Sequence, residues 1–139
     1  MTVHLNPYLG FRDSARQALE FYHSVFGGDL RIGTFREMGA DVGPDDADKV
    51  MHGQLDIGGG LVLMASDAPA DHPVDAGSSI SVSLSGDDVE ALTRWWHALS
   101  EGATIIEPFT QAPWGDTFGM LTDRFGTTWL VNATTTQLG

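Results

Sequence analysis

Two residues of this sequence, His52 and Glu37, are of types that could act as a general base. His52 lies in the alternating stretch 50–57, where Gln54 shares its parity. Glu37 lies near the end of the stretch 29–38, where Phe35 shares its parity. Imidazole and carboxylate groups exchange protons near neutral pH when their surroundings adjust their pKa values. The sequence shows neither a nucleophile nor a paired carboxylate beside His52. A histidine hydrogen-bonded within a sheet is therefore the alternative interpretation.

The same side chains could instead hold a metal ion, because divalent cations accept imidazole and oxygen ligands. Such a site would combine His52, Gln54 and Glu37 with His4. Purified protein with no bound metal would exclude it.

Two aromatic residues, Trp114 and Phe118, flank Gly115-Asp116 at the entry to an expected strand. Their rings could stack on a planar or cationic ligand. They could equally close the core or form a dimer contact, as aromatic side chains commonly do.

The composition describes a folded, acidic protein. The chain has 139 residues, a 42% hydrophobic fraction and a formal net charge of -12. This charge repels nucleic acid and anionic lipid, and it would attract a cationic ligand or simply maintain solubility. The absence of cysteine excludes thiolate chemistry and disulfides. No apolar run approaches the length of a membrane span, so we expect no membrane partner and a cytoplasmic location.

The elements that must position these residues follow one order twice. A strand at 3–11 is followed by a helix that begins after Asp13-Ser14 and stops at Gly27-Gly28. Further strands are expected at 29–38, 50–57 and 61–64, with Gly58-Gly59-Gly60 as a hairpin turn. The loop 39–49 is polar and acidic, and it could be a lid or a solvated connection.

The second half repeats this order after the turn-rich stretch 66–77. A strand at 79–84 precedes a helix that Asp87 and Glu90 would start as a capping box, and Gly102 ends that helix. Strands at 104–110 and 117–123 lead into a hairpin at 121–132, where Asp123 and Gly126 supply the turn. Corresponding positions lie 74 or 75 residues apart in the first strands and helices and about 66 apart in the last strands.

A set of short motifs in a fixed order covers nearly the whole chain, and their order and spacing carry a family resemblance. They are Asn6-Pro7-Tyr8-Leu9, Ala18-Leu19-Glu20-Phe21-Tyr22, Val25-Phe26-Gly27-Gly28, Met51-His52-Gly53, Leu63-Met64-Ala65-Ser66-Asp67, Trp114-Gly115-Asp116, and Asp123-Arg124-Phe125-Gly126 with Trp129. The chain resembles the PhnB-like branch of the vicinal oxygen chelate superfamily, which includes glyoxalases, dioxygenases and bleomycin resistance proteins.

The resemblance implies an α+β fold of two tandem βαβββ modules that form an open, cup-shaped mixed sheet with the helices outside. One glyoxalase-like domain would span 1–139, with module one at 1–66, a linker at 67–77 and module two at 78–139. It also implies a small-molecule ligand inside the cup and a homodimer. Metal-dependent relatives take ligands from the first and last strands of each module, and these positions fall on Asn6, Ser81, Val62 or Met64, and Leu130. Alkyl groups cannot coordinate an ion, so we expect no metal cofactor there.

Strand parity then gives seven residues expected to face the ligand, which are Asn6, Tyr8, Phe35, His52, Gln54, Ser81 and Leu130. Trp114 and Phe118 are expected to join them from the entry to a strand near the mouth of the cup. Three functions remain open: metal-independent binding, which includes sequestration of a drug; a glyoxalase-type lyase or isomerase, or a dioxygenase, with His52 or Glu37 as base; and a structural or regulatory dimer. Methyl transfer is disfavoured because the three glycines lie in a hairpin rather than between a strand and a helix.

Overall fold

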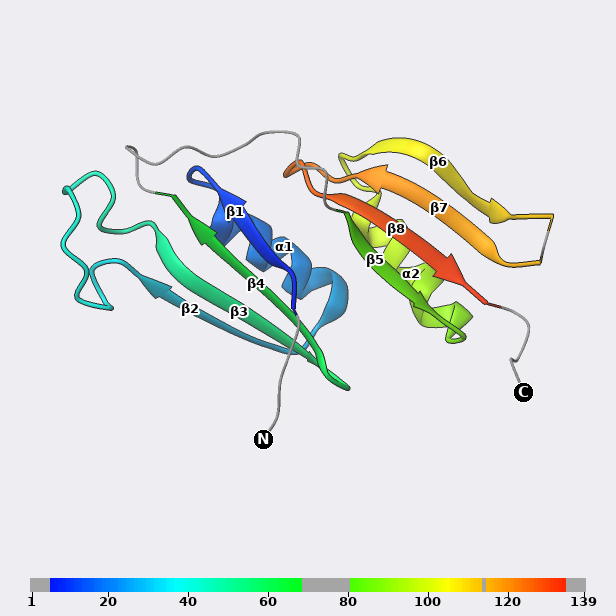
Figure 1. Cartoon of the computed structure of the whole chain (residues 1–139), viewed down its shortest axis with the longest axis horizontal. Helices are drawn as coiled ribbons and strands as arrows, with labels where there is room; N and C mark the ends of the chain where they lie inside the picture. Colours follow the sequence, from blue (N-terminus) through cyan, green and yellow to red (C-terminus); the bar gives the residue numbers. More distant parts are fainter. Residues whose placement is uncertain (1–5, 69–80, 114, 135–139) are drawn as a thin grey trace. The chain divides into compact units, whose positions relative to one another are not determined.

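A computed structural model describes residues 6–68, 81–113 and 115–134. The chain divides into two compact units, Met1–Asp75 and Ala76–Gly139. Within the described residues, each unit holds one helix and a sheet of four strands (Figure 1). The predicted α+β class and the repeated strand, helix and three strands are confirmed.

The N-terminal unit contains β1 (Tyr8–Phe11), α1 (Ala15–Phe26), β2 (Asp29–Thr34), β3 (Val50–Gly58) and β4 (Leu61–Asp67). The sheet order is β1-β4-β3-β2, and the β1–β4 pair is parallel while the other pairs are antiparallel. Helix α1 packs on one face of this sheet, mainly over β3.

The C-terminal unit contains β5 (Val82–Gly86), α2 (Val89–Leu99), β6 (Thr104–Gln111), β7 (Thr117–Thr122) and β8 (Thr128–Ala133). Its order, β5-β8-β7-β6, repeats that of the first sheet, again with one parallel pair between the first and last strands. The predicted start of α2 was wrong by one residue, because Asp88 rather than Asp87 accepts the capping hydrogen bond, at 3.1 Å from the Ala91 amide.

Each sheet has one face toward its helix and one face away from it, which we call the open face. A Cβ added to Gly53 would collide with Leu19 of α1, and one added to Gly119 would meet the Trp96 ring of α2 at 2.8 Å. Because side chains alternate along a strand, the neighbours of these glycines lie on the open faces. His52 and Gln54 are therefore on the open face of the N-terminal unit, and Phe118 and Met120 on that of the C-terminal unit.

The N-terminus of α1 is capped by Asp67, a residue distant in the sequence. Ser14 precedes the helix but makes no side-chain capping bond. The buried carboxylate of Asp67 instead accepts from the Ala15 amide and from the Val50 amide, each at 2.9 Å. The predicted linker was therefore wrong at its beginning, because Asp67 is the last residue of β4 and holds the helix and two strands together.

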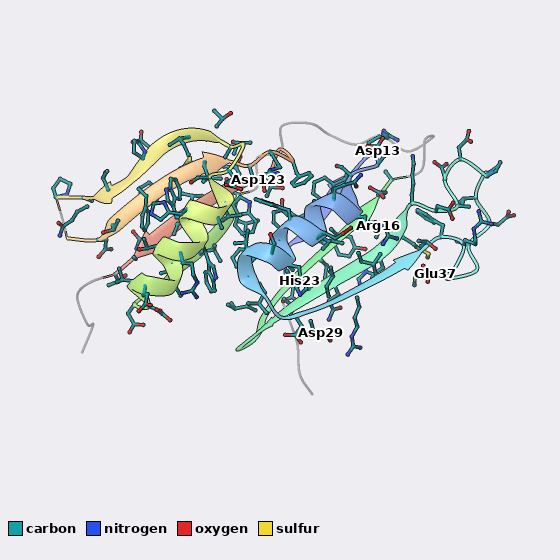
Figure 2. All side chains as sticks on the ribbon, turned by 180° about the vertical axis from the view of Figure 1, so that it is seen from behind. Asp13, Arg16, His23, Asp29, Glu37 and Asp123 are labelled. Carbon is teal, nitrogen blue, oxygen red and sulfur yellow. The ribbon has the colours of Figure 1, made fainter. Side chains whose placement is uncertain are left out.

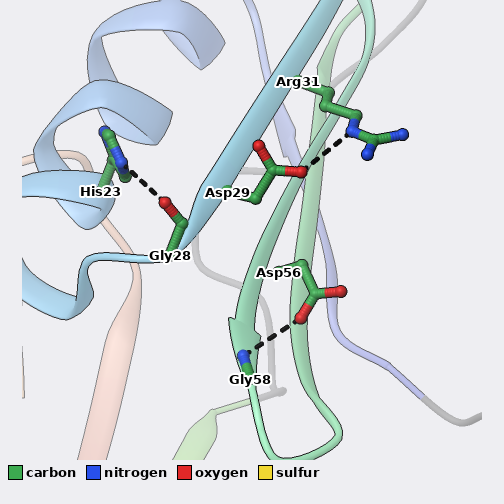
Figure 3. Close-up of polar contacts among 6 residues, drawn as sticks. All are labelled: His23, Gly28, Asp29, Arg31, Asp56 and Gly58. Atoms are coloured by element: carbon green, nitrogen blue, oxygen red, sulfur yellow. Dashed lines mark hydrogen bonds and ion pairs between the residues drawn. The ribbon is translucent and has the colours of Figure 1, made fainter.

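The end of α1 leads into β2 through two glycines with positive φ, Gly27 and Gly28. A Cβ on Gly28 would overlap the backbone of Asp56, so only glycine fits this close approach. The exposed His23 ring contacts the Gly28 carbonyl oxygen at 3.1 Å, as Figure 3 shows. As the sequence predicted, His23 lies on the outer side of the helix.

Two hairpin turns join the last strands of the units. Gly58, Gly59 and Gly60 all have positive φ and turn β3 into β4, as predicted. In the β7–β8 turn, Asp123 accepts hydrogen bonds from the Phe125 and Thr127 amides and, through its other oxygen, from Trp129 Nε1 at 2.9 Å. Asp123 is labelled in Figure 2.

The second strand is shorter than the sequence predicted. The stretch 29–38 was expected to be extended throughout, but β2 ends at Thr34 and a turn follows. Backbone hydrogen bonds from Phe35 to Lys49 and from Arg36 to Ala47, of 3.1 and 2.8 Å, attach this turn to the far end of the loop 39–49. Lys49 and Asp46 form an ion pair of 2.9 Å within the loop.

Candidate functional site

A tyrosine and a histidine meet on the open face of the N-terminal unit. Tyr8 Oη lies 3.1 Å from His52 Nδ1, and the two ring centroids are 5.7 Å apart. Tyr8 belongs to β1 and His52 to β3, with β4 between them in the sheet. The hydrogen bond therefore crosses over an intervening strand and fixes both rings on one face.

The residues around this pair come from the neighbouring rungs of the sheet. Met64 of β4 is in register with Tyr8 on one side and with Gln54 on the other. Both Met64 and Gln54 are half-buried, whereas Tyr8 is 52% exposed. The predicted candidates Tyr8, His52 and Gln54 are thus brought together on one surface.

A second methionine reaches this surface from the turn after β2. Gly33 is in register with His52, and a Cβ built on Gly33 would lie 2.9 Å from Met38 Sδ and 3.9 Å from the His52 carbonyl oxygen. The Met38 thioether therefore occupies the space that a side chain at Gly33 would fill. Met38 is half-exposed and was missed by the sequence analysis, which placed it at the end of an extended strand.

Glu37 stabilises the turn that contains Met38 through two hydrogen bonds with Thr34. Its carboxylate accepts from the Thr34 amide, and its own amide donates to Thr34 Oγ1, each at 3.1 Å. This reciprocal arrangement is a capping box. The hydrogen bond from the Thr34 amide, then the Thr34 hydroxyl and the charge of Arg16, lower the pKa of Glu37. A carboxylate with a lowered pKa is a weaker base. Figure 2 shows Glu37 at the end of β2.

The spacing Thr34-x-x-Glu37 is a recognisable capping-box signature, so the sequence did contain a signal for the end of the strand. Phe35 follows Thr34 in the same turn and is buried, whereas it was predicted to face the ligand from a strand. Asn6 is half-buried and precedes β1, outside any strand.

The open face of the C-terminal unit is different in chemistry. Leu130 and Phe118 lie on it, half-buried, and Ser81 is exposed just before β5. The Asn132 side chain donates to Asp116 Oδ2 at 3.3 Å beside Phe118. Trp114 and the predicted ligand His4 lie outside the described residues.

Charged residues lie on the same face, beside the row of paired residues that holds Tyr8, Met64 and Gln54. Asp29 and Asp56 are in register on the open face, and Arg31 forms a 3.0 Å ion pair with Asp29 (Figure 3). Asp56 also accepts from the Gly58 amide at 3.0 Å. Among the residues that the structure describes, no three His, Asp or Glu side chains group as metal ligands. Within the same residues, no helix is long and apolar enough to cross a membrane.

Comparison with solved structures gives the class of this fold. The chain matches a glyoxalase/bleomycin resistance protein/dioxygenase family enzyme from Burkholderia phytofirmans with a TM-score of 0.60 and 18% identity, over 91% of this chain and 96% of that one. Protein PA1353 from Pseudomonas aeruginosa is more similar, with a TM-score of 0.83 and 34% identity over 96% and 98% of the two chains. The fold is therefore glyoxalase-like.

The sequence comparison then gives the family. A model described as 3-demethylubiquinone-9 3-methyltransferase matches residues 4–132. A Bacillus cereus protein described as a putative 3-demethylubiquinone-9 3-methyltransferase, PhnB protein, has a TM-score of 0.72 and 22% identity, over 94% of this chain and 98% of that one. The chain belongs to this PhnB-like family, as the order of its motifs indicated.

Proposed function

We propose that this chain binds a small molecule on the open face of its N-terminal unit and does so without a metal ion. The observation that carries the proposal is the Tyr8–His52 hydrogen bond, which fixes two polar rings on a sheet face that α1 does not cover. Small-molecule sites are mostly apolar with a few precisely placed polar groups. The two thioethers of Met38 and Met64 supply apolar surface around the pair.

The donor chemistry at the family's metal positions supports binding without a metal. These positions carry Asn6, Ser81, Leu130, and either Val62 or Met64. Hard divalent cations prefer carboxylate and imidazole ligands, and an alkyl side chain offers no lone pair. The residues at these positions do not fit the usual metal ion, so the proposed function does not involve one.

A ligand screen with matched variants tests the proposal. Saturable shifts of the Tyr8 and His52 NMR signals on addition of a compound, with unchanged affinity in the presence of a chelator, are the expected result. Tyr8→Phe combined with His52→Asn should weaken binding, whereas Ser85→Ala on the other unit should not. Saturable binding that needs stoichiometric metal, measured by elemental analysis of the purified protein, would overturn the metal-independent part.

An enzymatic role is the second candidate, because an imidazole held by a phenol can transfer protons. It would be a glyoxalase-type lyase or isomerase, or a dioxygenase, with His52 as the base. Loss of a measured turnover in His52→Ala, with folding preserved, is the expected outcome. Methyl transfer has less support, because Gly58–Gly60 form a hairpin turn rather than a strand-to-helix loop for a nucleotide-like cofactor.

We also propose that the chain forms a homodimer, as the resemblance implies. Drug sequestration would be one use of the proposed binding face. Sedimentation equilibrium at micromolar concentration should give twice the 14.9 kDa chain mass. A monomeric mass would contradict the proposed homodimer.

A further inference from the structure

We infer that the ligand of the Tyr8–His52 site is a neutral molecule with an apolar or aromatic body and a hydrogen-bond-accepting oxygen, which His52 Nε2–H binds. This inference rests on the proposed function and names its ligand class. It follows from the direction of one hydrogen bond, from the surfaces beside that bond, and from the charges on the same face.

The direction of the hydrogen bond is set by the two partners. A phenol is the more acidic donor, and the bare nitrogen of a neutral imidazole is the stronger acceptor. Tyr8 therefore donates its hydroxyl proton to His52 Nδ1, across the 3.1 Å between them. The bond that one imidazole nitrogen makes determines the protonation of the other, so Nε2 carries the hydrogen.

The resulting Nε2–H is a donor on the open face. Among the residues that the structure describes, no hydrogen bond engages Nε2 of His52. His52 is only half-buried, so a ligand can reach the ring. A ligand that accepts a hydrogen bond would satisfy this donor, and a ligand that can only donate would leave it without a partner.

Apolar groups lie beside the donor, on the same face as the Gln54 amide. Met64 lies in the strand that the Tyr8–His52 bond crosses, and Met38 stands beside Gly33, which is in register with His52. Thioethers make favourable contacts with aromatic rings and adapt to irregular shapes. The half-exposed Tyr8 ring adds a third apolar surface. The body of the ligand is therefore apolar or aromatic.

The charges on this face argue against an anionic ligand, and an ammonium ligand is disfavoured because it cannot accept the hydrogen bond of Nε2–H. Asp29 and Asp56 both lie there, and the Arg31 guanidinium is paired with Asp29. The chain as a whole has a formal net charge of -12. An anionic acceptor would be repelled, whereas a ketone, amide or ester oxygen accepts a hydrogen bond without this cost.

The first test reads the hydrogen on the imidazole directly. In a long-range ¹H–¹⁵N spectrum of the uniformly labelled full chain, His52 should appear as the Nε2–H tautomer at neutral pH, and the missing signal in His52→Asn assigns it among the five histidines. Tyr8→Phe should shift the Nδ1 resonance, because the nitrogen loses its donor. A dominant Nδ1–H tautomer, or an Nδ1 resonance that does not respond to Tyr8→Phe, would overturn the inference.

The second test compares three probes of nearly equal shape: acetophenone, benzoate and 1-phenylethylammonium. Acetophenone, the neutral acceptor, should perturb the His52 and Met38 signals at the lowest concentration. Met38→Ala should lower its affinity about threefold, the lower range expected for a sulfur–aromatic contact. Tighter binding of the ammonium or of benzoate would overturn the ligand class and leave the proposed binding face standing. Saturable binding of none of the three at His52 would count against the binding face itself.

Discussion

The two units place corresponding strand residues 66 positions apart and yet fill their open faces with different chemistry. The corresponding pairs are His52 with Phe118, Gln54 with Met120, and Met64 with Leu130. The N-terminal unit thus presents an imidazole and an amide where the C-terminal unit presents a phenyl ring and a thioether. The repeat keeps the scaffold and varies the surface that no helix covers.

The helix-facing positions behave in the opposite way. Gly53 and Gly119 correspond, and in each unit an added Cβ would collide with a side chain of the packed helix. Close-packed interiors tolerate little change in volume. Packing against the helix therefore constrains one face of each sheet, and the open face is available for binding.

The units also differ in how their helices begin. The N-terminus of α1 is held by Asp67, a distant residue at the end of β4, whereas α2 is capped locally by Asp88. The position that corresponds to Asp67 in the second unit is Ala133, which is buried and apolar.

Asp67→Ala should reduce the free energy of unfolding the most, by about 3 kcal/mol, because two buried amides lose their acceptor at about 1–3 kcal/mol each. Asp88→Ala is the matched control and should cost about 1 kcal/mol, the usual value of a helix cap. Urea unfolding of the full chain measures the totals, and hydrogen exchange at the Ala15 and Val50 amides localises the loss. Equal losses in the two variants would contradict the contrast between distant and local capping.

Gly119→Ala should cost about 2 kcal/mol through overpacking, because the new Cβ meets the Trp96 ring and the Phe109 backbone, both at about 2.9 Å. Gly53→Ala meets the flexible end of Leu19 and should cost less. All four tryptophans follow residue 76, so their fluorescence reports the C-terminal unit. A larger loss of unfolding free energy in Gly53→Ala than in Gly119→Ala would contradict this order. It would show that the Leu19 side chain yields less than the Trp96 ring.

His52→Phe gives the N-terminal unit the residue of the C-terminal one. Because His52 lies on the open face, the free energy of unfolding should change by no more than about 0.5 kcal/mol. The variant has no Nε2–H to bind the ketone oxygen. The shift of the Met38 NMR signals on addition of acetophenone should therefore be lost. An undiminished response would show that the difference between the two open faces is not what selects the ligand.

Glu37→Gln should have the smallest effect, and one that depends on pH. The lowered pKa of Glu37 means that its carboxylate stabilises the folded chain above the pKa of the unfolded chain, about 4.3. This stabilisation is lost as the pH falls through the lower pKa of the folded chain. Wild type and variant should therefore converge in thermal unfolding midpoint in acid and differ slightly at pH 7. A constant difference down to acid pH would contradict the capping-box assignment.

Much of the fold could be predicted because its signals are local. Asp13-Ser14 and the glycines after the apolar stripe gave the two ends of α1, and Asp123 with Gly126 gave the last turn. The end of β2 was missed, although Thr34 and Glu37 carry a local signature, because the alternation continues beyond Thr34 and predicts a longer strand. Met38 was missed for the same reason, since only the turn brings it back beside Gly33.

The sequence by itself determined the repeat, the two kinds of element, the family, and the parity that puts His52 and Gln54 on one face. These properties depend on periodicity and on residues close in the chain. The tertiary structure decided what lies beside His52: Tyr8 from 44 residues away, Met64 from the strand between them, and Met38 from a capped turn. It also decided that Asp67 caps α1 from 52 residues beyond Ala15. Contacts between distant residues depend on strand order and register, which alternation along one strand does not contain.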